Sequence, residues 1–188
     1  MPDLLEIRLN KNLQMEGLRN IEINWGRNAL RLNYDSEVSY FETSLGNRVE
    51  IIRLLQDTLT YQLYNLDTGE IQKVEDGFFD QFKIDISYNC FGYCFADSEC
   101  FIINPEQIIR DEYVEVTVAE AEIIVFLEYK FINDDGQHQF KYSHAVKVNN
   151  DGSVSFKPGI NQLIENVSKN SAIHNYNFNR ELYLKKRV

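Results

Sequence analysis

Cys90 and His144 are the two residues of this 188-residue chain whose types and surroundings favour covalent chemistry. A cysteine nucleophile needs a base within hydrogen-bond reach and donors for the oxyanion that its attack creates. The N-terminus of a helix lowers the pKa of a thiol and offers free N–H groups. Cys90 lies where a helix is expected to begin, with Ser87 or Asn89 as its cap, and His144 lies on an expected strand. We therefore interpret Cys90 as a nucleophile and His144 as its base.

Three short stretches, around Cys90, before His144 and from His144 onward, follow one another along the chain. They are Asn89-Cys90-Phe91-Gly92-Tyr93, the apolar run Ala121-Glu122-Ile123-Ile124-Val125-Phe126, and His144-Ala145-Val146-Lys147-Val148 before an Asp-Gly turn. This order resembles the NlpC/P60-like branch of the papain-like superfamily, over roughly residues 78–160. In that family the nucleophile motif reads D-C-S-G followed by an aromatic residue or leucine, so Asn89 replaces Asp and Phe91 replaces Ser.

The resemblance implies a cysteine-dependent hydrolase that acts on an amide or peptide bond of a peptide or protein, with acyl-transfer and deamidation as variants. A bacterial effector or toxin is one setting for such a papain-like peptidase or amidase. Asn89 and Tyr88 would help to hold the oxyanion or the substrate. A third residue orients the imidazole in such sites. Its identity stays open among four residues, Ser155, His174, Asn161 and Asn175.

Other groups that could carry chemistry have plainer interpretations. The three cysteines, Cys90, Cys94 and Cys100, are an odd number and do not predict a disulfide framework. With a histidine they could hold zinc, but they lack the C-x₂-C spacing of zinc knuckles, so we expect no metal and no other cofactor. The acidic pair Glu120 and Glu122 is interpreted as surface charge rather than an acid–base dyad.

The charge of the chain narrows the classes of partner. Asp and Glu total 29 against 19 Lys and Arg, which gives a formal net charge of −10. This balance excludes nonspecific binding to nucleic acid and docking on anionic lipid, since both need a basic surface. It is compatible with a basic protein partner. The alternative function is therefore a noncatalytic acidic binding protein of the immunity or adaptor type that neutralises a protein partner. The oligomeric state is not predicted.

The first residues give an expectation about compartment. Residues 1–6 carry neither a basic segment nor an apolar core typical of a signal peptide. No apolar run approaches the ~18–20 residues that span a bilayer. We expect a cytoplasmic protein, or one exported without a classical signal peptide, and no membrane partner.

The elements that must position these residues predict an α+β fold. Residues 1–76 form a strand-rich N-terminal region, and residues 77–188 form a papain-like catalytic core, an antiparallel sheet with a nucleophile-bearing helix. Alternating apolar residues and Gly turns predict strands at 29–34, 60–66, 71–74, 113–118, 121–131, 140–148 and 153–156. Helices are expected over 48–59, from Cys90, after Pro105 and over 161–167.

Overall fold

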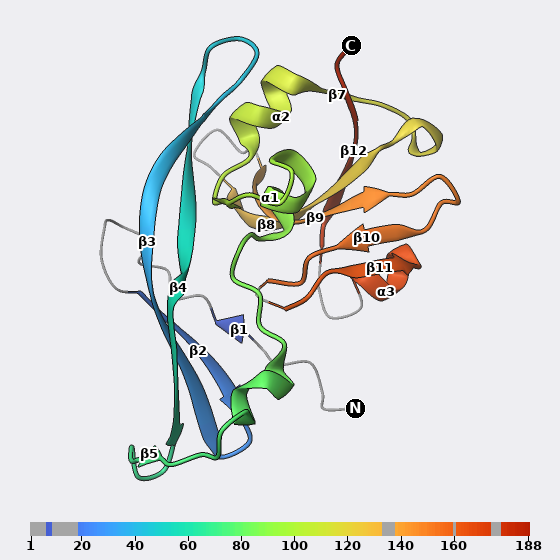
Figure 1. Cartoon of the computed structure of the whole chain (residues 1–188). Helices are drawn as coiled ribbons and strands as arrows, with labels where there is room; N and C mark the ends of the chain where they lie inside the picture. The colour runs from blue at the N-terminus through green and yellow to red at the C-terminus, as the bar shows by residue number, and fades with distance from the viewer. Residues whose placement is uncertain (1–6, 9–18, 133–137, 160, 174–177) are drawn as a thin grey trace.

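A computed structural model describes residues 7–8, 19–132, 138–159, 161–173 and 178–188, with side chains from residue 26 onward in these ranges. Two antiparallel sheets make up most of it, and short helices lie between and beside them (Figure 1). The elements, in chain order, are β1 (Ile7–Arg8), β2 (Arg19–Trp25), β3 (Asn28–Glu42), β4 (Arg48–Asn65), β5 (Ile71–Gln72), η1 (Phe78–Phe82), α1 (Cys90–Phe95), β6 (Phe101–Ile102), α2 (Glu106–Glu112), β7 (Tyr113–Glu115), η2 (Val118–Glu120), β8 (Ile123–Ile132), β9 (His138–Val148), β10 (Val154–Phe156), β11 (Ile164–Val167), α3 (Lys169–Ala172) and β12 (Arg180–Lys186).

The first sheet is built on one long hairpin. β3 and β4 pair from Asn28 opposite Asn65 to Glu42 opposite Arg48, with β2 and then β1 beside β3 and with β5 and β6 on β4. Leu30 and Leu32 alternate with polar residues along β3 and are fully buried, because strand side chains point to opposite faces in turn. The tip of the hairpin is held to α2, where the buried Asp111 carboxylate accepts a 2.6 Å hydrogen bond from the Thr43 hydroxyl.

The second sheet has the order β11-β10-β9-β8-β12-β7 and is buried on both faces at its centre. Ile123 and Val125 face a core that includes α1, α2 and the β4 residues Val49 and Ile51. Ile124 and Phe126 face the opposite side, where Ala172 of α3 joins the core. This double burial accounts for the unbroken apolar run that begins β8, since a strand covered on both faces has no polar side.

The predicted α+β papain-like fold is wrong. The structure is mostly antiparallel β-sheet, and its three described α-helices have six, seven and four residues. The helix expected over 48–59 is part of β4, and the one expected over 161–167 gives way to β11. In β4 the apolar residues occupy both faces of the strand, so Val49, Ile52 and Leu55 have the spacing of a helix while pairing with β3.

Several local predictions are confirmed. A helix begins at Cys90 with Asn89 as its N-cap, and another follows Pro105. The Asn149–Gly152 segment turns β9 into β10, as the Asp-Gly pair predicts. The division near residue 76 separates most of the two sheets, but β6 pairs with β4 across it. A shared core therefore joins the region 1–76 to the rest of the chain.

Candidate functional site

Helix α1 carries the predicted nucleophile, and its geometry follows from Asn89. The Asn89 Oδ1 accepts a 2.9 Å hydrogen bond from the Gly92 N–H, which caps the helix. The same Oδ1 accepts from the Ile102 N–H at 3.2 Å, and Nδ2 donates to the Ile102 carbonyl at 2.8 Å. The side chain expected to position substrate is therefore used to fasten α1 to β6.

The Cys90 side chain lies inside the protein, against the predicted base strand. Helix α1 packs on β9, and the backbone N–H of Ala145 is directed at the Cys90 sulfur. Cys90 is 8% exposed and belongs to the core between the two sheets. Burial raises the pKa of its thiol to about 11, and the surrounding N–H groups offset this only in part. At neutral pH Cys90 is a protonated thiol, whereas a nucleophile requires the thiolate.

His144 faces away from Cys90. It lies opposite Phe126 in the β8–β9 pairing, and its ring is 6.1 Å from that of Phe126 and 5.4 Å from that of Phe156. Those residues form the core on the α3 side of the sheet, whereas Ala145, the next residue, belongs to the core that contains Cys90. The structure therefore places the predicted nucleophile and the predicted base on opposite faces of one sheet.

His144 gives the chain a pH-dependent stability. Its ring is 3% exposed among aromatic residues, and burial lowers its pKa to about 4. Between pH 6.5 and pH 4 the unfolded chain binds a proton at this position and the folded chain does not, so stability falls as pH falls. We expect this residue to account for about 3 kcal/mol of lost unfolding free energy over that window. Below pH 4 both states are protonated and the loss ends.

Urea unfolding at pH 7, 5.5 and 4, followed by circular dichroism, measures this slope. In His144→Phe the fall between pH 7 and pH 4 should shrink by about 3 kcal/mol, while His138→Gln, at an exposed histidine, should keep it. An imidazole that held the Cys90 proton would have a raised pKa. Its stability contribution would grow as pH falls, and that opposite slope would contradict the buried, neutral His144.

The residues predicted for the third catalytic position either make structural contacts or lie outside the described residues. Ser155 lies on the Cys90 face, opposite Lys147, and is 3% exposed. Its Oγ accepts a 3.0 Å hydrogen bond from Asn149 Nδ2, so it braces the β9–β10 turn and does not orient His144. Of the other candidates for the third position, His174 and Asn175 lie outside the described residues, and Asn161 lies in the turn after β10, where its N–H donates to the Pro158 carbonyl at 3.0 Å.

Tyr88 belongs to a cluster that the sequence did not reveal. Its ring stacks on that of Tyr93 at 6.3 Å, and a lysine lies over each, Lys157 over Tyr88 at 4.9 Å and Lys147 over Tyr93 at 4.5 Å. Lys157 is fully buried, and its Nζ donates to the Asp85 carbonyl at 2.6 Å. In the sequence, the hint to this cluster is that Lys157 lies two residues after Ser155 and would therefore share its face of an extended segment. That spacing does not show whether the lysine is buried or solvated.

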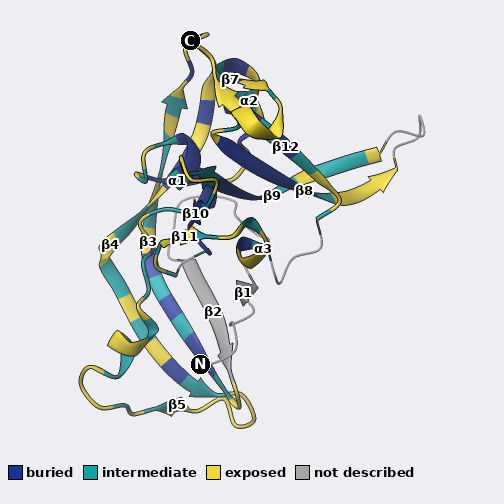
Figure 2. Ribbon diagram, turned by 90° about the vertical axis from the view of Figure 1, so that its right-hand side faces the viewer, coloured by how far each residue is buried: buried dark blue, intermediate teal, exposed yellow. Residues whose placement is uncertain are grey.

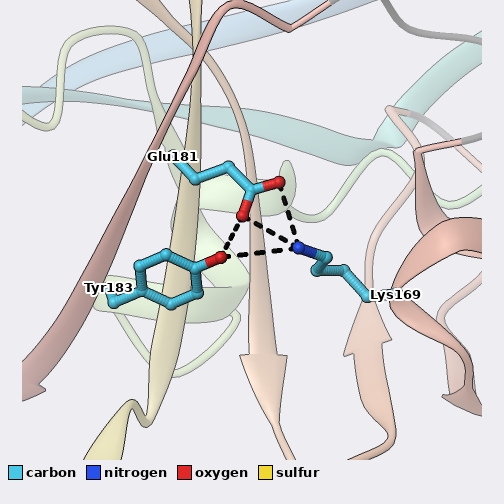
Figure 3. A network of polar contacts seen from close by, with 3 residues as sticks. All are labelled: Lys169, Glu181 and Tyr183. Atoms are coloured by element: carbon cyan, nitrogen blue, oxygen red, sulfur yellow. Dashed lines mark hydrogen bonds and ion pairs between the residues drawn. The ribbon is translucent and has the colours of Figure 1, made fainter. Parts of the chain in front are cut away.

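A second polar cluster lies on the opposite face of the same sheet. Lys169 of α3 binds both carboxylate oxygens of Glu181, at 3.1 and 2.9 Å, and the Tyr183 hydroxyl donates to the same carboxylate (Figure 3). Glu181 and Tyr183 are two residues apart on β12 and so point to one side. This cluster fastens α3 over the core around Phe126.

The described residues show no group of three or more His, Cys, Asp or Glu side chains placed to hold a metal ion. All three cysteines are free and buried. No helix in the same part of the chain is both long and apolar enough to cross a membrane. The candidate site thus contains a buried thiol, two stacked tyrosines and two lysines, without a base on the face of the thiol among the described histidines.

The chain was compared with family models, with curated proteins and with solved structures, and no match was found. The resemblance to NlpC/P60-like hydrolases therefore stays a prediction from the motif around Cys90.

Proposed function

We propose that this chain is a noncatalytic acidic binding protein, of the immunity or adaptor type, that recognises a basic protein partner. The observation that carries the proposal is the placement of Cys90 and His144 on opposite faces of one sheet. Their pKa values move away from those of a thiolate–imidazolium pair, because burial raises the first and lowers the second. The hydrolase read from the motif thus lacks the proton transfer that its reaction needs.

The surface supports binding. Among the described acidic side chains only Asp111 is buried, so the other described carboxylates lie at least partly in contact with solvent. Carboxylates gather where β4 turns into β5 and η1, an end of the molecule that is largely exposed (Figure 2). Exposed acidic residues there are Asp67, Glu70, Glu75, Asp76 and Asp80. Such a field accelerates association with a basic protein and makes it sensitive to salt.

Thiol reactivity tests this proposal. With iodoacetamide at pH 7.5, we expect Cys90, Cys94 and Cys100 of the folded protein to react roughly a hundredfold more slowly than a free cysteine, since all three are buried and their pKa values are raised. Mass spectrometry of tryptic peptides gives the rate at each position, and the protein in guanidinium chloride supplies the fully reactive control. Fast, selective labelling of Cys90 would contradict the noncatalytic proposal and support the hydrolase interpretation.

The proposed binding of a basic protein is tested with a purified partner. A basic protein retained by the immobilised chain should, once repurified, bind the Cys90→Ser variant with unchanged affinity. Its association rate should fall steeply between low and physiological salt. Binding that is lost in Cys90→Ser while the fold is kept, or binding that ignores salt, would contradict an electrostatic, noncatalytic interaction.

A further inference from the structure

The half of the β3–β4 hairpin nearer its tip has a strand edge that no other described strand covers. Within the described residues, β2 pairs with β3 only as far as Tyr34, whereas β3 continues to Glu42. β6 pairs with the other edge of β4, so β3 is the outermost strand here, at the margin of the molecule (Figure 1). We call the outer side of residues 35–42 the β3 edge.

Hydrogen bonding at the hairpin tip shows which backbone groups of this edge point outward. The Thr43 N–H donates to the Asn47 carbonyl at 2.9 Å, so these two residues form a hydrogen-bonded pair. Such pairs recur at every second residue of an antiparallel ladder, and the register with β4 is unbroken over residues 35–42. The N–H and C=O groups of four residues therefore point away from β4 and have no hydrogen-bond partner within the described residues, namely those of Ser36, Val38, Tyr40 and Glu42.

The β3 edge lacks most of the features by which proteins prevent an edge strand from pairing. Natural edges are commonly short, or carry lysine, proline or a bulge. Residues 35–42 contain neither lysine nor proline, and the register shift lies before them, between Asn33 and Asp35. The Ser36 hydroxyl oxygen, at the first outward position, is shielded from solvent and has no hydrogen-bond partner among the described residues. The edge therefore offers unused hydrogen-bonding groups to an incoming strand.

The charge around the β3 edge indicates what such a strand would carry. Asp35, Glu37 and Glu42 are exposed, and none of them is in an ion pair with another described residue. Residues 35–57, which contain this half of the hairpin, hold five acidic residues against two arginines. Two such edges would repel each other, so the charge disfavours a second copy of this chain and favours a basic segment.

We propose that the basic partner docks on the β3 edge by adding an extended segment as a further strand, with lysine or arginine side chains opposite Asp35 and Glu37. Val38 and Tyr40, which is 52% exposed, lie on the other face of the same edge and would contact apolar side chains of the segment. This inference rests on the proposed function and names the form in which the partner binds. Backbone hydrogen bonds would supply affinity, and the acidic side chains would select the charge of the partner.

Amide hydrogen exchange with a synthetic strand, followed by ¹⁵N–¹H spectra, tests the proposal on the full chain. The probe is Ac-Thr-Lys-Val-Lys-Thr-Lys-Val-Lys-NH₂. The matched probe has its four central residues N-methylated, which keeps the charge and removes the N–H donors. At about ten times the Kd of the first probe, exchange should slow about tenfold at the four outward amides. The amides of Glu37, Ser39 and Phe41, which face β4, should keep their rates, and the matched probe should protect none.

Val38→Pro is the matched variant of the protein, since it removes one outward N–H and leaves the bonds to β4 in place. We expect it to weaken binding of the first probe by more than about tenfold, because the ring also blocks close approach of a strand. Val38→Thr keeps the N–H and should bind within about twofold of the unmodified chain. If Val38→Pro does not fold, the N-methylated probe decides, because it needs no variant.

Equal protection by the two probes, or protection of the amides that face β4, would overturn strand addition. Slow exchange of the outward amides without a probe would show that another segment of the chain covers the edge, or a second copy where protection grows with protein concentration. Either finding would also overturn the proposal. A basic protein that binds Val38→Pro as tightly as the unmodified chain keeps the proposed function and removes the edge from it. A probe that adds to the edge while every purified basic protein fails to bind keeps the edge and removes the proposed function.

Discussion

Replacing Gly92 by alanine should destabilise the protein by more than about 3 kcal/mol, at the upper end of what overpacking a core costs. A Cβ at this position would lie 1.8 Å from the carbonyl oxygen of Cys100 and 3.2 Å from the Cβ of Tyr88. The first contact is with backbone, so no side-chain rotation can relieve it. Helix α1 would have to move away from the segment that leads into β6 and would lose its Asn89 contacts to Ile102.

Helix propensity predicts the opposite sign for this substitution. Alanine favours a helix over glycine by about 1 kcal/mol, so a helix free of close neighbours would gain stability. Urea unfolding followed by circular dichroism decides between the two. Gly69→Ala is the matched control, because Gly69 has a positive φ but nothing within 4 Å of the added Cβ. It should cost only about 1 kcal/mol of backbone strain. If Gly92→Ala does not fold while Gly69→Ala does, the close approach is equally supported, whereas an unchanged Gly92→Ala would refute it.

The motif around Cys90 shows why a catalytic resemblance can arise from packing. Asn89 caps α1 and binds Ile102, Gly92 lets the helix approach Cys100, and Tyr93 stacks on Tyr88. Packing of a six-residue helix and its cap thus explains the residue types around Cys90 that suggest a nucleophile motif. Order and spacing along a sequence cannot separate these two origins, since both require a capped helix start with a small residue in its first turn.

The helix that begins at Cys90 does pack on the strand that carries His144, but the His144 side chain points to the opposite face of that strand. Helix α1 does pack on β9, and the residue that the Cys90 sulfur meets is Ala145. Side chains alternate between the two faces of a strand, so a shift of one residue moves an imidazole from one core to the other. Local pattern could not decide which face each side chain takes, because β9 is buried on both faces around Ala145 and its pairing with β8 shifts by one residue between Tyr142 and His144.

The two mistaken helices have a related cause. Residues 48–59 and 161–167 contain apolar residues at helical spacings, yet both join strands of the sheets. In β4 the spacing arises because Val49 and Ile51 serve the core around α1 while Ile52 lies on the other side of the strand and pairs with Phe101 of β6 in the ladder. Turn residues were the more dependable signal, because the Asp-Gly at 151–152 fixes its hairpin through backbone angles alone.

Lys157→Ala should lower the unfolding free energy by about 4 kcal/mol, since it removes a fully buried stem together with its polar contacts. The Lys157 side chain is 0% exposed, and its Nζ lies 2.6 Å from the Asp85 carbonyl oxygen and 3.5 Å from the Asp85 carboxylate. It thereby ties the segment before α1 to the end of β10. Lys157→Met keeps the stem and should recover about half of the loss. Lys169→Ala, at a lysine that is 35% exposed and paired with Glu181, should cost within about 1 kcal/mol.

The pH dependence of the unfolding free energy at alkaline pH distinguishes the contribution of the Lys157 charge from that of its packed aliphatic stem. Burial lowers the pKa of Lys157, and the Asp85 carboxylate offsets this in part. Between that lowered pKa and 10.5, the unfolded chain binds a proton at this position more often than the folded chain does. Stability should therefore rise with pH in this window, and the rise should vanish in Lys157→Met. Equal pH profiles of the two proteins, measured by urea unfolding from pH 8 to pH 10.5, would mean that this lysine stabilises the fold through its stem alone.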